Sequence, residues 1–70
     1  MKRVIVNHKD GEKEILTNVD DIDMYRDHVD IYFYFDESEP IPVRTIYKRN
    51  VKSVYEEYEF FGDRRTERIL

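Results

Sequence analysis

The sequence predicts an all-β domain, and three observations favour this class. The 70 residues contain seven Val and seven Ile against two Leu and no Ala, and six Tyr and four Phe supply most of the other apolar bulk. β-Branched and aromatic side chains fit a pleated, half-buried surface, whereas Ala and Leu favour helices. Apolar and polar residues also alternate between turn-forming residues. We therefore expect a single antiparallel meander of five or six strands, strongly twisted or curled into a small open barrel of SH3-like size.

The length allows one small domain. Hydrophobic residues make up 40% of the chain and charged residues another 40%, which is more apolar mass than disordered chains contain. We expect the β domain to span 1–62. Residues 63–70 are expected to form a charged C-terminal tail, either a short helix capped by Asp63 or a frayed end. A core this small is marginally stable, so we also expect a homodimer.

The first two strands are expected to form a hairpin. Val4 and Val6 lie on one face of the first strand, at 3–7, and Ile5 lies on the other. Asp10-Gly11 follows, and this pair is a strong turn signal because Gly takes the positive φ that the turn requires. The returning strand is expected at 13–17.

The clearest strand is expected at 29–36, after a strand beginning near Ile22 and a turn at 26–28. Its residues alternate between two chemically different faces. The face expected in the core contains Val29, Ile31, Phe33 and Phe35. The opposite face contains Asp30, Tyr32, Tyr34 and Asp36.

Pro40 and Pro42 place the next strand, at 43–47, at a sheet edge or a bulge, because proline cannot donate to a ladder. A bend at 48–50 leads to a long last strand over 51–61. Residues 53–59 fit one helical turn as an alternative.

A five-residue pattern occurs twice. Asn-Val-Asp-Asp-Ile at 18–22 is echoed by Asn-Val-Lys-Ser-Val at 50–54. We interpret both as tight corners in which the Val and the apolar residue three positions later enter the core. An internal duplication is the alternative.

Charge is segregated along the chain, although the net charge is only −4. Residues 10–39 contain eleven acidic and two basic residues, a net charge of −9, whereas 40–55 contain four basic residues and no acid. Such segregation can steer a charged partner, and the alternative is that these are only solvated surfaces. The expected partner-binding surface contains Asp20, Asp21, Asp23, Asp30, Tyr32, Tyr34, Asp36, Glu37 and Glu39.

Two alternatives use the same features differently. The basic residues Arg44, Lys48, Arg49 and Lys52 predict a nucleic-acid-binding small barrel, with Tyr32 and Tyr34 as a stacking platform. Interleaved Asp30 and Asp36 would repel phosphates, so we favour a protein partner, for which exposed Tyr is typical. The tyrosines could instead form a homodimer interface.

Catalytic, metal and cofactor sites are not expected. The chain has no Cys, which excludes disulfides, thiolate zinc sites and cysteine nucleophiles. The segment 21–27 begins like a calcium loop, but Arg26 stands where that loop needs Gly. No apolar run approaches a membrane span or a signal peptide, so we expect a cytoplasmic, non-enzymatic protein without a membrane partner.

The arrangement resembles that of small β proteins of Gram-positive bacteria and their phages. The resemblance covers residues 3–58 and consists of the basic, apolar first strand, Lys9-Asp10-Gly11, and the Asn18-Val19 and Asn50-Val51 corners. It implies a phage-type inhibitor that binds and blocks a host protein, such as a defence or nucleic-acid-processing protein. It assigns no functional residue to this chain.

Overall fold

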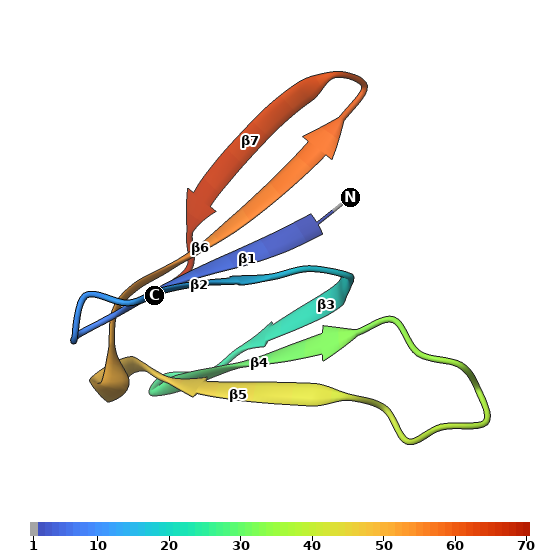
Figure 1. The fold of residues 1–70 in the computed structure, drawn as a ribbon, viewed down its shortest axis with the longest axis horizontal. Coiled ribbons are helices and arrows are strands. Elements are labelled where there is room, and N and C mark those ends of the chain that lie inside the picture. The colour runs from blue at the N-terminus through green and yellow to red at the C-terminus, as the bar shows by residue number, and fades with distance from the viewer. Residues whose placement is uncertain (1) are drawn as a thin grey trace.

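A computed structural model describes residues 2–70 and confirms the all-β class. The strands are β1 (Lys2–His8), β2 (Lys13–Leu16), β3 (Val19–Met24), β4 (His28–Phe33), β5 (Val43–Tyr47), β6 (Val51–Phe60) and β7 (Asp63–Arg68). A single turn of 3-10 helix, η1 (Lys48–Asn50), connects β5 to β6 (Figure 1).

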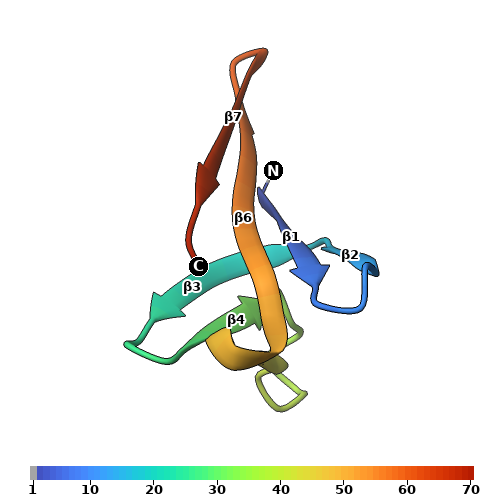
Figure 2. The same cartoon turned by 90° about the vertical axis from the view of Figure 1, so that its left-hand side faces the viewer.

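The strands form two antiparallel sheets rather than the single meander expected from the sequence. One sheet has the order β2-β1-β6-β7, and the other has the order β3-β4-β5. Figure 2 shows β6 running across β3 and β4. The meander is wrong because β1 pairs with β6 as well as with β2, and such non-local pairing leaves no signal in local alternation. Within residues 2–70 no pairing joins the two sheets, so no closed barrel is observed.

The core lies between the sheets, and within residues 2–70 its buried hydrophobic members are all β-branched. Its buried members are Val4, Val6, Val19, Val29, Ile31, Ile46, Val51 and Val54. Leu16, Ile22, Phe33, Ile69 and Leu70 pack against this cluster and are partly buried. Burying one such aliphatic side chain contributes about 1.5–3 kcal/mol, so the Val/Ile-rich composition supplies the main stabilising term.

The β1–β2 hairpin is confirmed. Gly11 has a φ of +94°, and the backbone N–H of His8 donates to the carbonyl of Glu12 at 2.8 Å. The carboxylate of Asp10 accepts the N–H of Glu12 at 2.9 Å, which is how Asp commonly stabilises a turn.

The strand expected at 29–36 ends earlier. β4 stops at Phe33, and a long loop connects it to β5. Phe35 is therefore 41% exposed, and its expected place in the core is wrong. The chain leaves the sheet at Tyr34, whose N–H donates to the carbonyl of Asn18 at 3.0 Å. β5 begins after both prolines and is an edge strand, as their positions predict.

The C-terminal region corrects a second expectation. Residues 53–59 belong to β6, so the expected long strand is confirmed there and the alternative of a helical turn is wrong. Residues 63–68, however, are neither helical nor frayed, because they form β7 and pair with β6. Phe61 and Gly62 both have positive φ and make a two-residue turn, so Gly62 reverses the chain instead of ending the domain.

Candidate functional site

The outer face of the β3-β4-β5 sheet brings together four of the predicted site residues. Residues opposite each other in an antiparallel pair share a face, and Ile22 and Ile31 are opposite each other on the core side. The neighbouring positions therefore point outward. Asp21 is opposite Tyr32, and Asp23 is opposite Asp30. We call Asp21, Asp23, Asp30 and Tyr32 the tyrosine–aspartate face.

This face concentrates negative charge around a tyrosine. Asp23 and Asp30 are directly opposite each other, an arrangement that is destabilising for like charges. Desolvation raises the pKa of Tyr32 above its ordinary value, and the charges of Asp23 and Asp30 raise it further. The hydroxyl of Thr45 on β5 donates to the Asp30 carboxylate at 2.6 Å. A cationic or hydrogen-bond-donating partner would relieve the repulsion between the carboxylates.

An aromatic row continues the same outer face at its other end. The rings of Tyr25 and His28 are stacked, with centroids 4.5 Å apart and planes within 9°. His28 is opposite Tyr47 on β5, and their ring centroids are 5.6 Å apart. The guanidinium of Arg49 lies 4.9 Å from the centroid of Tyr47. Period-two alternation from Asp30 back to His28 was the signal that could have placed this row on the face.

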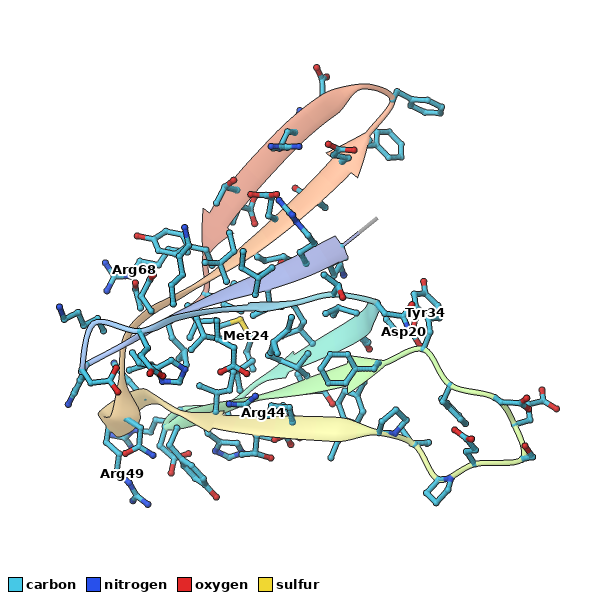
Figure 3. The ribbon with its side chains drawn as sticks, in the orientation of Figure 1. Asp20, Met24, Tyr34, Arg44, Arg49 and Arg68 are labelled. Carbon is cyan, nitrogen blue, oxygen red and sulfur yellow. The ribbon has the colours of Figure 1, made fainter. Side chains whose placement is uncertain are left out.

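The remaining predicted acidic-surface residues lie elsewhere. Tyr34 is 60% exposed and follows the end of β4, while Asp36, Glu37 and Glu39 lie on the β4–β5 loop. Asp20 is the extra residue of a β-bulge at the start of β3. Figure 3 shows Asp20 and Tyr34 close together at the end of β4 where the loop begins. The nine predicted residues therefore do not form one surface.

Tyr34 instead borders an open groove of about 790 Å³. The lining residues are Lys2, Thr17, Asn18, Val19, Tyr34, Glu56, Tyr58, Glu59, Phe60 and Glu67. The ammonium of Lys2 pairs with Glu56 at 3.3 Å. Phe60 and Phe61, at the tip of the β6–β7 hairpin, are 65% and 94% exposed.

The four predicted basic residues do not form one surface either. Arg44 pairs with Glu14 of β2, with one of its contacts at 2.9 Å, and so links the two sheets. Lys48 and Arg49 lie on η1, and Lys52 lies on β6. Figure 3 shows Arg44 near the middle of the molecule and Arg49 on the far side of η1. Arg44 is therefore used by the fold, while Arg49 faces outward.

Comparison with protein-family models, curated proteins and solved structures finds no match to this chain. Across residues 2–70 no helix is long and apolar enough to cross a membrane. The same residues contain no group of three or more His, Cys, Asp or Glu side chains placed to hold a metal ion.

Proposed function

We propose that this chain is a non-enzymatic protein-binding module that contacts a basic surface of its partner through the tyrosine–aspartate face. The observation that carries the proposal is the pairing of Asp23 with Asp30 beside Tyr32. Two opposed carboxylates destabilise the isolated fold through their like charges, whereas a partner's Lys or Arg would find two acceptors at once.

Tyrosine at the centre of such a face supports a protein partner. Tyr is enriched in interfaces because a large apolar ring carries a hydroxyl that can hydrogen-bond. Tyr32 is half-buried and lies close enough to Asp23 and Asp30 for their charges to act on it. A partly buried side chain has less freedom to lose on binding than a fully exposed one. The resemblance to small phage β proteins adds the expectation that the partner is a host protein that is blocked by binding.

The proposal is tested by capture from a lysate of a Gram-positive host. The tagged wild-type chain is compared with Asp23→Asn/Asp30→Asn and with the matched control Glu37→Gln/Glu39→Gln, which removes the same charge from the β4–β5 loop. We expect a captured protein that the first variant loses and the control retains, and less capture as salt is raised. Capture of the same protein by all three chains would show that the face is not the contact surface.

Sedimentation distinguishes a host partner from a second copy. If the face binds a host partner, Tyr32→Ala should leave the oligomeric state of the free chain unchanged, including the homodimer that the small core predicts. A dimer that dissociates in Tyr32→Ala would show that the face binds another copy of the chain, and the proposal of a host partner would then be wrong.

A further inference from the structure

A second candidate site lies at the end of the outer face, where the turn between β3 and β4 meets η1. It is a pocket of about 370 Å³ lined by Arg26, Asp27, Tyr47, Lys48 and Arg49. We propose that this pocket, the Tyr47 pocket, binds a small phosphorylated aromatic ligand of the mononucleotide class.

The pocket is a local concentration of positive charge in a chain whose net charge is −4. Its lining contains three cationic side chains, Arg26, Lys48 and Arg49, and one carboxylate, that of Asp27. None of these three cations forms an ion pair within 4.0 Å in the described part of the chain, whereas Arg3, Arg44 and Arg64 all do. Arg49 lies over the Tyr47 ring and its charge acts on Asp27, but no pocket cation is paired with a carboxylate within 4.0 Å in the described residues, so these charges are available to an anion.

Asp27 offsets only one of the three positive charges, so the pocket keeps a net positive charge. Its Oδ1 lies 2.5 Å from Nδ1 of His28, and this hydrogen bond lowers the pKa of Asp27. The backbone also fixes the site. The N–H of Lys48 donates to the carbonyl of Asp27 at 2.9 Å, which holds η1 against the β3–β4 turn. The pocket cations therefore lie on two backbone segments, the β3–β4 turn and η1, which this hydrogen bond holds together.

Tyr47 provides an aromatic ring on which the base of the ligand can stack. Its ring is 39% exposed, with the Arg49 guanidinium 4.9 Å from its centroid and the tilted His28 ring 5.6 Å away. A nucleobase can stack on such a ring, and a guanidinium can bind a phosphate through two parallel hydrogen bonds. A ligand that carries both groups matches the combination better than a bare anion does.

A single nucleotide fits the surroundings better than a nucleic-acid strand. Asp30 lies two residues along β4 from His28, which corresponds to roughly 7 Å. The carboxylates of Asp23 and Asp30 would repel the next phosphates of a strand laid along the face. The pocket volume also lies within the range of small-molecule sites.

The test is titration of the ¹⁵N-labelled chain with AMP and ATP, followed by NMR of the backbone amides. We expect saturable shifts confined to 25–28 and 47–49, and at least tenfold weaker binding in Lys48→Ala/Arg49→Ala. The matched control Lys9→Ala/Lys52→Ala loses the same charge outside the pocket and should bind as the wild type does. Tyr47→Leu keeps the cations and should also weaken binding.

Three outcomes would overturn the proposal. The first is the absence of saturable shifts with both nucleotides. The second is equal affinity for inorganic pyrophosphate, with Tyr47→Leu unchanged, which would leave only a non-specific anion site. The third is tighter binding of a single-stranded oligonucleotide with shifts that spread along β6, which would identify a nucleic-acid surface. The proposed protein partner is not involved in this titration, so the two proposals fail or succeed separately.

Discussion

At the scale of single residues, Glu14 joins three strands through one carboxylate. It lies on β2, accepts from Arg44 on β5, and is 2.9 Å from Nε2 of His8 on β1. The contact with Arg44 is an ion pair between the two sheets, whose buried apolar residues also pack together. Arg44 shares a strand face with the buried Ile46, so alternation places it on the core side and not on an outer basic surface.

The pairing of Glu14 predicts a loss of stability at acid pH. The hydrogen bond from Arg44, followed by that from His8, lowers the pKa of Glu14 below its ordinary value of 4.5. A carboxylate with a lowered pKa stabilises the fold above its unfolded-state pKa, and this contribution is lost as the pH falls through the folded-state pKa. Glu14→Gln should cost about 0.5–1 kcal/mol at pH 7 and should show a smaller further loss between pH 5 and pH 3.

Urea unfolding at pH 7, 5 and 3 measures this effect. The matched variant is Glu12→Gln, because Glu12 is exposed and its side chain makes no ion pair in the described chain. This variant should have the wild-type free energy of unfolding at pH 7, and it should lose as much of it between pH 5 and pH 3 as the wild type does. An acid loss in Glu14→Gln as large as that of the wild type would contradict the role given to the pair.

Core residues predict a sharper contrast. Ile31 is fully buried at the centre of the three-stranded sheet, whereas Ile41 is 58% exposed on the β4–β5 loop. Ile31→Val should lower the free energy of unfolding by about 0.5–1.5 kcal/mol, because one buried methylene is lost and a small cavity is left. Ile41→Val should change it by less than about 0.5 kcal/mol. Chemical denaturation of both variants measures the difference, and equal effects would show that the core is misplaced.

At the scale of elements, the two Asn-Val corners have the same irregularity. Val19 pairs with Phe33 and Asp21 pairs with Tyr32, which leaves Asp20 as an extra residue in β3. Likewise Lys52 is extra in β6, between the pairings of Val51 and Ser53 with β1. An extra residue shifts the alternation by one, so residues three apart turn toward the same side. This explains why Val51 and Val54 are both buried, and why Val19 is buried with Ile22 partly so.

The β6–β7 hairpin is closed by an unusual turn. Phe61 has a φ of +50° and is 94% exposed, although bulky residues are rare at positive φ. Phe61→Asn would create an Asn-Gly turn, the preferred sequence for two positive φ values. We expect it to raise the free energy of unfolding by about 0.5–1 kcal/mol.

Thermal unfolding followed by circular dichroism checks this expectation. Phe60→Asn is the matched control, since Phe60 is also exposed but lies in β6 and not at positive φ. It should not stabilise the hairpin. A lower melting temperature for Phe61→Asn would mean that the Phe61 ring contributes packing that outweighs the backbone strain.

At the scale of the whole molecule, local patterns predicted the class, most strands and the Val/Ile core, while long-range pairing decided the rest. The convergence of Asp23 with Asp30 follows from the register of the β3–β4 hairpin, which its turn sets within a few residues. The pairing of β1 with β6 joins residues about fifty positions apart. It is stabilised by the apolar side chains that both sheets bury together, and no local pattern records that burial. The Tyr47 pocket was missed for the same reason, because Arg26 and Arg49 are adjacent only after β4 and β5 pair.

The C-terminal residues provide the last prediction, because they attach the end of the chain to the core. The N–H groups of Ile69 and Leu70 donate to the carbonyl of Val54 at 2.8 and 3.2 Å, and both side chains pack against the buried cluster. Deleting 69–70 removes this partial burial and exposes a fully buried Val54, so we expect a loss of about 2–4 kcal/mol. For a domain of this size, that is a large fraction of the total stability. Arg65→Ala/Thr66→Ala, on exposed positions of β7, should cost less than about 1 kcal/mol. If urea unfolding showed the truncated chain to be as stable as the wild type, the end of the chain would be dispensable, as a frayed tail would be.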